Sequence, residues 1–471
     1  MVSASRPRTW RSPDPRVPNR PAGRAGTSPD GALAAVLAVA GSALFAVSPR
    51  AGLAFAGTLT GLWLVTSPEL GLALLVAVVP FDQLSGLLPG GALALTRLLG
   101  GTVAAVWLAA LVLQRRRPLW DRRVTSLALL LGWAALILPW TVRPKISAAG
   151  IATLAQLFLL YWLTRDLLRR PEQLGRLLDT GLIAAVGLAI VVFWQLEVGR
   201  ERATVSLDGI EFNANYLATA LVVPLVIAVA RSCGWGRPLW RLAAASPLAV
   251  AVVLTGSRGG LMAALAGIAV ILVARPRLTP LILAGVLAAG SAAVVMAPAP
   301  VVENLTERLR SSFADRGSGR LDIWIVAGRM AAGNPVTGVG LAGFRPAFRE
   351  YFLEAPVDPR WAADVRNRYG DRAAHNTPLL VLAELGVVGF ALFLSAVVRH
   401  LRPAWRACKR PSVKGRHLEG DIPLAVLAGF SALLVGSLSI DALELKATWL
   451  LLGMVGAAAG QNAARSERKL Q

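Results

Sequence analysis

The sequence predicts an all-α protein that crosses a membrane many times, and three observations support this fold class. Of the 471 residues, 55% are hydrophobic and only 16% are charged, and the mean hydropathy is +0.57. The apolar residues are gathered into runs, many of which approach the length that spans a bilayer core. The Arg and Lys residues stand mainly in the short gaps between these runs. A water-soluble single-domain enzyme is therefore not expected.

The chain begins with a polar segment. Residues 1–30 contain six Arg and six Pro and hardly any large apolar side chain, so we expect a disordered cytoplasmic tail. The first apolar run follows without a prominent small-residue cleavage site, so it is interpreted as a signal-anchor helix and not as a removable signal peptide. Residues 31–297 are expected to form the N-terminal transmembrane helices.

Fourteen apolar segments are candidate membrane crossings. They lie at residues 32–47, 52–66, 67–80, 93–113, 124–141, 146–164, 177–196, 214–230, 242–256, 259–274, 279–297, 377–398, 423–440 and 445–461. The second and third are short and meet at Ser67-Pro68, so they could form one re-entrant hairpin, which would leave about 12 crossings. The C-terminal transmembrane region is expected over 377–461, followed by a cytoplasmic tail over 462–471.

Charge predicts the orientation. With the N-terminus in the cytoplasm, the cytoplasmic segments hold 30 of the 49 Lys and Arg, against eight in the short external loops. Positively charged short loops stay in the cytoplasm, so both termini are expected there. The net charge of +22 thus indicates membrane topology, with a lipid bilayer as partner and no nucleic acid. Cys233 and Cys408 fall on the same reducing side and have no metal-ligand spacing.

The longest gap between apolar segments is 298–376, which is expected to be a large external loop with amphipathic helices. A helix is predicted over RLDIWIVAGRMAA (320–332), ended by Gly333-Asn334-Pro335. Leu321, Trp324 and Ile325 have the spacing of one face of this helix. Gly328, next along that face, would let another element approach closely. The stretch 345–372 is rich in Arg and aromatic residues.

Three cationic or titratable residues fall on the external side, namely Arg258, Arg320 and His375. Charged groups at the mouth of a membrane bundle are functional candidates because they are costly there. Arg258 follows Ser257 in a tight Ser-Arg-Gly-Gly turn whose glycines permit close approach of the backbone. Its guanidinium could donate two hydrogen bonds to a phosphate. The alternative is an interfacial Arg that reaches to the lipid headgroups.

Arg320 opens the predicted helix one turn before Trp324, so both side chains could face one site. A guanidinium there could hold an anion, or stack on a sugar or an aromatic surface. The alternative is an exposed Arg paired with Asp322 or Asp315.

His375 precedes Asn376-Thr377-Pro378 and a long apolar segment. Thr377 suits the N-cap and Pro378 the first helical position, so His375 is expected just outside a helix N-terminus. The positive end of a helix disfavours a second positive charge, so the imidazole should be neutral and able to accept a proton. The alternative is a polar residue that caps a loop. The other two histidines, His400 and His417, are expected in the basic cytoplasmic loop.

Six further residues are candidates for a supporting role: Arg97, Asn215, Ser257, Trp324, Asn376 and Glu384. Glu384 is an acidic group within a predicted crossing and could pair with an Arg or with the backbone. Arg97 could contact a second anion or reach to the headgroups. Asn215 could hydrogen-bond a sugar or cap its helix.

Four stretches in the C-terminal half carry a family resemblance. They are NANYLATALVVPL (213–225), TGSRGGLMAALAG (255–267), GSGRLDIWIVAGRMAAGNPVTGVGLAGF (317–344) and HNTPLLVLAELGVVGFALF (375–393). The most specific part is H-N followed by E-x-G-x-x-G, preceded by R-x-x-x-W and N-P-x-x-G-x-G. In this order the stretches resemble the superfamily of O-antigen ligases and polymerases, which are integral membrane glycosyltransferases. The N-terminal half agrees with it only in hydropathy.

The resemblance implies a GT-C-like helical bundle in the bacterial inner membrane, with its active site facing the periplasm or exterior. It implies an undecaprenyl-diphosphate-linked glycan as donor, with Arg258 and Arg320 holding the diphosphate and His375 as the base of an inverting transfer. No metal or other cofactor is implied. The acceptor hydroxyl would belong to the lipid A core in a ligase, to the growing polysaccharide in a polymerase, or to a protein in an oligosaccharyltransferase. The residues do not separate these three.

A lipid-glycan transporter or flippase is the alternative from another class. It predicts two halves of related hydropathy and charged residues near the bilayer midplane. The notable charges instead gather at one face, together with the largest loop. A purely structural scaffold would have no need of Arg and His at one pocket mouth.

Overall fold

The computed structural model describes part of the chain. The described residues are 68–82, 95–196, 205–207, 210–211, 213–232, 239–296, 303, 306–307, 310, 319–353, 355–357, 372–408 and 421–467. The predicted tail over 1–30, the first two apolar segments and the residues Cys233 and His417 lie outside them.

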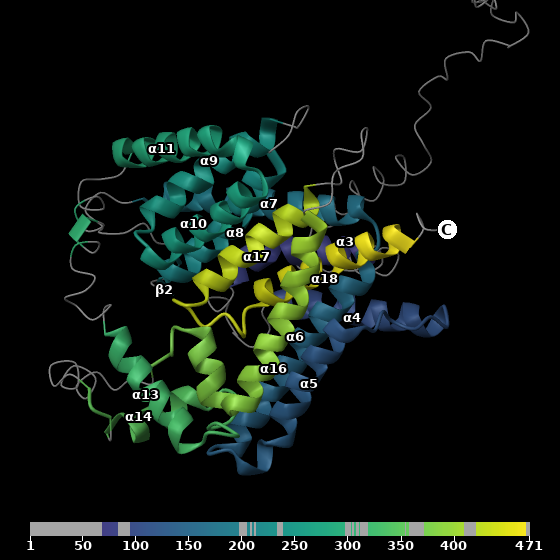
Figure 1. The fold of residues 1–471 in the computed structure, drawn as a ribbon, viewed down its shortest axis with the longest axis vertical. Helices are drawn as coiled ribbons and strands as arrows, with labels where there is room; N and C mark the ends of the chain where they lie inside the picture. The colour runs from purple at the N-terminus through teal and green to yellow at the C-terminus, as the bar shows by residue number, and fades with distance from the viewer. Residues whose placement is uncertain are drawn as a thin grey trace, which may run out of the picture. The chain divides into compact units, whose positions relative to one another are not determined.

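The described part is built almost entirely of helices (Figure 1). They are α3 (Pro68–Val78), α4 (Leu95–Leu113), α5 (Arg122–Leu136), α6 (Pro144–Leu167), α7 (Pro171–Trp194), α8 (Ala214–Ser232), α9 (Leu239–Leu254), α10 (Arg258–Ala274), α11 (Thr279–Met296), α13 (Arg320–Gly333), α14 (Phe344–Leu353), α16 (Thr377–Cys408), α17 (Ile422–Gly436) and α18 (Lys446–Glu467). Short 3-10 turns η2 (Leu138–Trp140) and η3 (Pro276–Leu278) join some of them. Two short strands, β1 (Ser206–Leu207) and β2 (Ile210–Glu211), pair antiparallel before α8.

Five described helices are long and apolar enough to cross a membrane: α4, α6, α7, α8 and α16. A sixth span is possible if α10 and the helix after it, which are bent by 118°, count as one. Several predicted crossings form helices that are too short, such as the 16 residues of α9 and the 15 residues of α17, whereas a straight span needs about 20. A helical membrane protein is therefore supported, and the count of 12 to 14 crossings stays a prediction.

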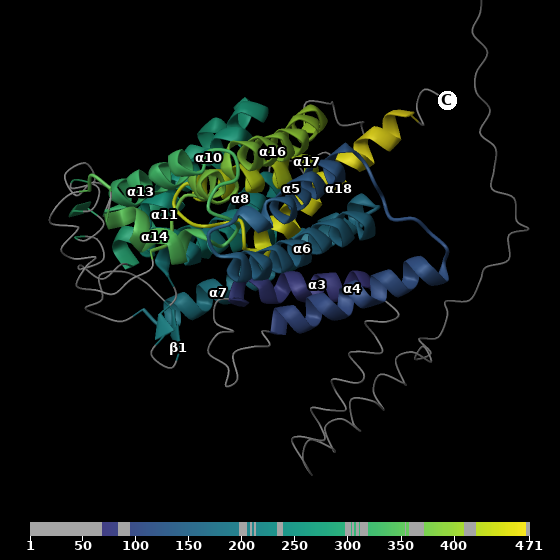
Figure 2. The same cartoon turned by 90° about the horizontal axis from the view of Figure 1, so that it is seen from below.

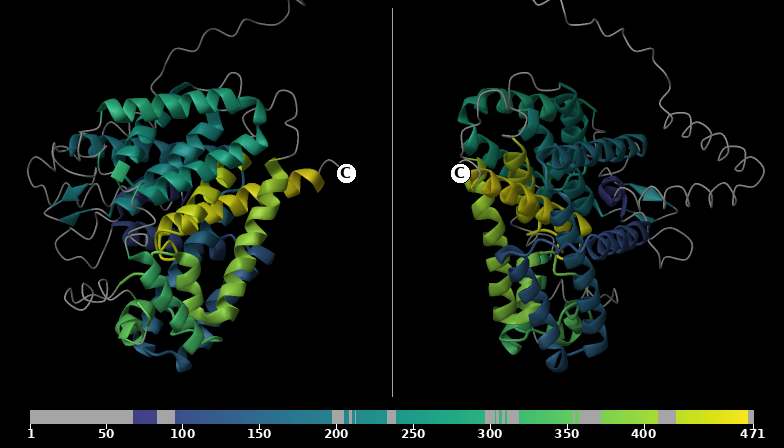
Figure 3. Two further views of the ribbon diagram at one scale, coloured as in Figure 1. Left: turned by 60° about the vertical axis from the view of Figure 1, so that its left-hand side comes forward. Right: turned by 90° about the vertical axis from the view of Figure 1, so that its right-hand side faces the viewer.

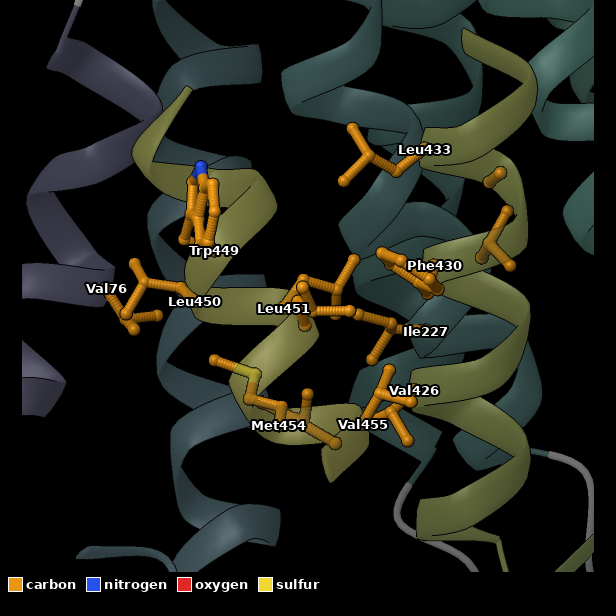
Figure 4. Packing of buried hydrophobic residues seen from close by; sticks show 14 of the residues in the cluster. Val76, Ile227, Val426, Phe430, Leu433, Trp449, Leu450, Leu451, Met454 and Val455 are labelled. Carbon is orange, nitrogen blue, oxygen red and sulfur yellow. The ribbon is translucent and has the colours of Figure 1, made fainter. Parts of the chain in front are cut away.

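The centre of the described part is α17, whose residues are nearly all buried. It packs against α8 and α10 on one side and against α18 on another. Figure 4 shows Phe430 and Val426 of α17 facing Leu451 and Val455 of α18, with Ile227 of α8 between the two helices. Figure 2 shows α3 and α4 side by side against α6 and α7. The tightly packed apolar core holds the ends of these helices in fixed positions.

The apolar segment 377–398 was expected to be one crossing, but the structure breaks it. Gly386 has the non-helical angles φ 67° and ψ −171°, so α16 consists of two legs joined at a sharp bend. Figure 3 shows the two legs. The first leg packs with α13 and the longer second leg with α5. The start of α16 contacts the loop between α17 and α18, whereas the bend contacts residues 335–337.

His400 corrects another expectation, because it lies within α16 and not in a cytoplasmic loop. It is fully buried, its Nδ1 lies 2.8 Å from the carbonyl oxygen of Ala396, and its Nε2 lies 2.9 Å from the hydroxyl oxygen of Tyr161. The helix continues past the apolar run as an amphipathic extension, with Arg399 and Arg402 exposed on its other face. The predicted segment ended at residue 398 because hydropathy alone does not show that the polar residue His400 is buried within the helix.

Arg side chains of the predicted cytoplasmic segments gather around three carboxylates. Asp166 accepts hydrogen bonds from Arg116 and from the indole N–H of Trp107, the latter at 2.8 Å. Asp179 pairs with Arg231 and Arg241, and Asp121 pairs with Arg165. Segments that the predicted topology places on the same side of the membrane thus contact one another.

Candidate active site

His375 lies in a tight turn that precedes α16. Its φ of +48° is in the left-handed region, which residues other than Gly and Asn seldom adopt. The carboxylate of Asp441 accepts hydrogen bonds from the backbone N–H groups of His375 and Asn376. On the other side of the turn, the indole of Trp324 donates to the carbonyl oxygen of Ala374 at 3.3 Å. The turn is therefore held from two separate elements.

The first residues of α16 are tied to the loop between α17 and α18. The N–H of Thr377 donates to the carbonyl oxygen of Ser437 at 2.8 Å. Its hydroxyl donates to the carbonyl oxygen of Ile440 at 2.9 Å and accepts from the N–H of Ala442 at 2.7 Å. Because these two partners occupy the hydroxyl, Thr377 is not the N-cap of α16, and the prediction is wrong. Asn376 caps the helix instead, with its Oδ1 accepting from the N–H of Leu379 at 3.1 Å.

The charges of three Arg residues act on the imidazole. Burial, and to a lesser extent the charges of Arg320, Arg345 and Arg372, together lower the pKa of His375 to about 4. The ring is therefore neutral at physiological pH. The direction agrees with the sequence-based expectation, but burial and neighbouring cations cause it, and not the helix end. Among the described residues, the Nδ1 atom of His375 has no hydrogen-bond partner.

Arg320 begins α13, as predicted, and the helix ends at Gly333 with Asn334 as its C-cap. The predicted close approach at Gly328 is wrong, because a different face of the helix is buried. The buried apolar residues are Ile323, Val326, Ala327 and Met330, whereas Leu321 is 44% exposed and nothing lies within 4 Å of a Cβ added at Gly328. Both sets of residues follow helical spacing, so periodicity alone could not choose between the two faces. Trp324 is partly buried beside this core, next to the His375 turn.

The N-P-x-x-G-x-G motif and the E-x-G-x-x-G motif pack against each other. The backbone N–H groups of Val339 and Gly340 donate to the carbonyl oxygens of Ala383 and Glu384, each at 2.9 Å. The N–H of Val387 donates to the carbonyl oxygen of Pro335 at 2.8 Å. A Cβ added at Gly386 would lie 2.1 Å from the carbonyl oxygen of Val336, so only glycine allows this approach.

Two partners were considered for Glu384, an Arg side chain or the backbone, and the structure shows the backbone. The side chain is buried, and its Oε1 accepts from the N–H of Phe344, the first residue of α14, at 3.1 Å. The N–H of Ala342 also donates to this carboxylate. Two donors at the start of α14 are thereby satisfied, and the next residue of that helix is Arg345.

Arg258 is half-buried at the start of α10. Ser257 is the N-cap, accepting from the N–H of Gly260 at 3.1 Å and donating to Oδ1 of Asn215 at 2.8 Å. A Cβ at Gly259 would lie 2.0 Å from Oγ of Ser439, so this glycine provides the close approach that the sequence predicted. The start of α10 therefore contacts the 437–442 loop. Arg320 is among the charges that act on the imidazole of His375, whereas Arg258 is not.

The structure also shows where the supporting candidates Asn215 and Arg97 lie. Asn215 does not cap α8, because the side chain of Asn213 accepts from the N–H of Asn215 at 3.0 Å. Arg97 is exposed on α4, and its neighbour Thr96 hydrogen-bonds Asp82. Asp82 in turn forms an ion pair of 2.6 Å with Lys446.

A cavity of about 150 Å³ lies beside the site. Apolar side chains of α3, α7, α8, α17 and α18 line most of it, including Leu450 and Leu451, which Figure 4 shows. Its polar lining residues are Tyr216, Thr219 and the Asp82–Lys446 pair. The N–H of Asp441 donates to the hydroxyl of Tyr216 at 3.4 Å, so this cavity reaches the residue that holds the His375 turn.

Three residues of the site were not singled out from the sequence: Arg345, Arg372 and Asp441. The Arg-rich stretch 345–372 contains the first two, but composition could not select them among its other Arg residues. Asp441 stands between two apolar segments on the predicted external side, where an acidic residue could have been noticed.

Residues 243–394 match the family model described as O-antigen ligase. The match covers less than half of the chain and includes Arg258, Arg320, His375 and Glu384. No curated protein matches the chain. The match supports the resemblance to the O-antigen ligase superfamily that the motifs indicated.

Proposed function

We propose that this protein is a membrane glycosyltransferase of the O-antigen ligase type, which moves a glycan from an undecaprenyl-diphosphate carrier to an acceptor hydroxyl. The observation that carries the proposal is a neutral His375 among three guanidinium groups, inside the region that matches the family. A neutral imidazole can accept a proton, and guanidinium groups bind phosphate oxygens through paired hydrogen bonds.

The proposed reaction uses His375, Arg320 and Arg258. The acceptor oxygen attacks the anomeric carbon from the face opposite the diphosphate, and its proton passes to the imidazole of His375. The new C–O bond forms as the bond from the anomeric carbon to the diphosphate breaks, so the anomeric configuration inverts. Arg320, with Arg258, stabilises the negative charge that develops on the leaving diphosphate. Fixed cations of this kind can do so without a divalent metal or another cofactor.

The membrane supplies part of the positioning. The carrier has a long apolar chain, and the cavity beside Tyr216 offers an apolar wall with a Lys at its polar end. Because the bilayer holds the apolar chain of the carrier, the protein has to orient only the headgroups of the donor and the acceptor. We place the protein in the bacterial inner membrane with both termini in the cytoplasm and the site facing the periplasm or exterior. Contacts between loops of the same predicted side support the grouping of these loops at one side, and the distribution of Lys and Arg carries the orientation.

The acceptor is proposed to be a sugar of the lipid A core, with a growing polysaccharide or a protein hydroxyl as the alternatives within the same superfamily. Deletion of the gene, complemented with the wild type or with His375→Ala, tests the proposal through the envelope glycans. A ligase predicts lipid-linked polymer that accumulates in the deletion strain, and a polymerase predicts single lipid-linked repeats. Normal transfer by His375→Ala would refute the catalytic assignment. Substrate movement across vesicles that does not depend on His375 would favour a transporter.

A further inference from the structure

We propose that Asp441 is a positioning residue, whose carboxylate holds the backbone of the His375 turn so that the imidazole meets the acceptor hydroxyl. The inference rests on the proposed transfer reaction and adds to it a residue that lies outside the region matching the family. It is carried by backbone geometry and by hydrogen bonds from three elements.

The backbone of the turn needs an external support. His375 is one of only three non-glycine residues with a positive φ among those that the structure describes. Such conformations are disfavoured for residues with a Cβ, and they persist where the surroundings impose them, often at functional sites. The strain here falls on the same residue that the proposed reaction uses as a base.

Asp441 provides that support. Two successive backbone N–H groups, those of His375 and Asn376, both donate to its carboxylate. Successive N–H groups in a turn form a concavity that binds an anion, and the Asp441 side chain occupies it. The other oxygen, Oδ1, is buried without a hydrogen-bond partner among the described residues. An Asn side chain could therefore replace the Asp, with its carbonyl oxygen accepting from the turn.

The position of Asp441 itself is fixed. Its N–H donates to the hydroxyl of Tyr216, and the neighbouring residues Ile440 and Ala442 both hydrogen-bond the hydroxyl of Thr377. The clamp therefore joins α8, the loop before α18 and the start of α16. A movement of His375 would require at least one of these contacts to break.

Burial makes the clamp sensitive to pH. The pKa of Asp441 is raised to about 6, chiefly by burial and also by the charge of Glu444. Arg345 and the two backbone donors act in the opposite direction. Tyr216 also faces the group through the N–H of Asp441. As pH falls through about 6 the carboxylate becomes protonated and accepts hydrogen bonds less strongly, whereas His375 stays neutral down to about pH 4.

The experiment compares Asp441→Ala, Asp441→Asn and the exposed control Glu172→Gln in the full chain, reconstituted in lipid nanodiscs with a lipid-linked glycan donor. For Asp441→Ala we expect a loss of about tenfold or more in kcat with the KM for the donor changed by less than about twofold, because a misplaced base impairs the chemical step. Asp441→Asn should retain most of the kcat at pH 7.5. Its acid limb should move from about pH 6 toward about pH 4. Glu172→Gln should behave as the wild type.

Several outcomes would overturn the clamp. These are a wild-type kcat for Asp441→Ala, an Asn variant as impaired as the Ala variant, or an acid limb that Asp441→Asn leaves in place. If Asp441→Ala does not fold, the pH profile of Asp441→Asn decides alone. Failure of the proposed function looks different, because the wild type would then show no transfer, or His375→Ala would transfer at the wild-type rate.

Discussion

Oε1 of Glu384 accepts a hydrogen bond from the backbone N–H of Phe344 at 3.1 Å, across 40 residues of sequence. This bond joins the two most specific motifs of the chain. It fixes the start of α14, where Arg345 follows at once. A buried carboxylate in a membrane helix thus serves to orient a cation toward His375.

Glu384→Ala should lower both stability and transfer. The substitution leaves the buried N–H groups of Phe344 and Ala342 without their acceptor, at a cost of about 1–3 kcal/mol each. Transfer should fall further because Arg345 loses its fixed position. Glu384→Gln keeps one acceptor oxygen and should lose less of both. Thermal unfolding in detergent and transfer in nanodiscs measure the two effects, and equal behaviour of the Ala and Gln variants would contradict the hydrogen-bonding role.

His375→Ala should abolish transfer while expression and membrane insertion stay normal. The pKa of His375 is lowered to about 4, so the unfolded state takes up its proton first as pH falls below about 6.5. The free energy of unfolding should therefore decrease between about pH 6.5 and 4, and part of this decrease should vanish in the variant. Melting temperatures of the wild type and the variant across this range check the sign. An unchanged pH dependence would indicate that the ring is not buried as described.

Arg345→Ala should weaken donor binding about tenfold or more, if a charge-assisted hydrogen bond to phosphate is worth about 1.5–3 kcal/mol. Removal of this cation should also raise the pKa of His375 and that of Asp441, because its charge lowers both. The KM for the donor and the pH profile of kcat report the two effects separately. A lower KM, or an acid limb displaced to lower pH, would show that Arg345 does not lie beside the donor phosphate and His375.

Arg258→Lys should impair transfer, because a single ammonium cannot reproduce two parallel N–H donors on a phosphate. Arg329→Lys, on an exposed part of α13, is the matched control and should transfer normally. Initial rates at saturating and limiting donor would show whether binding or turnover is affected. If Arg258→Lys is as active as this control, Arg258 is an interfacial anchor and Arg320 carries the diphosphate without it.

Local signals in the sequence predicted the helix from Arg320 and its end at Asn334, since a stop signal and an apolar period coincide there. They also predicted the close approach at Gly259. The N-cap of α16 was misassigned because the hydroxyl of Thr377 is used by Ile440, a partner 63 residues away. Asp441 could have been noticed as an acidic residue between two apolar segments, but its contact with the His375 turn could not. That contact exists only after α17 returns the chain to the start of α16, and no local pattern encodes it.

The bend in α16 shows the same limit and supplies a test. A single glycine inside an apolar helix is usually tolerated, so the sequence did not indicate a break at Gly386. Its φ of +67° and ψ of −171° belong to a region that only glycine occupies readily, and a Cβ would lie 2.1 Å from the carbonyl oxygen of Val336.

Gly386→Ala should therefore destabilise the protein by about 2–6 kcal/mol, with roughly 1–3 from backbone strain and 1–3 from overpacking. Gly328→Ala is the control, because that residue is exposed and helical with nothing within 4 Å of its Cβ. It should be neutral or stabilising by about 0.5–1 kcal/mol. Thermal unfolding of both variants in the same detergent gives the comparison. Similar melting temperatures would mean that α16 runs straight through Gly386, and the contacts that bring Pro335 and Val336 to this helix, and with them Arg345 to His375, would have to be abandoned.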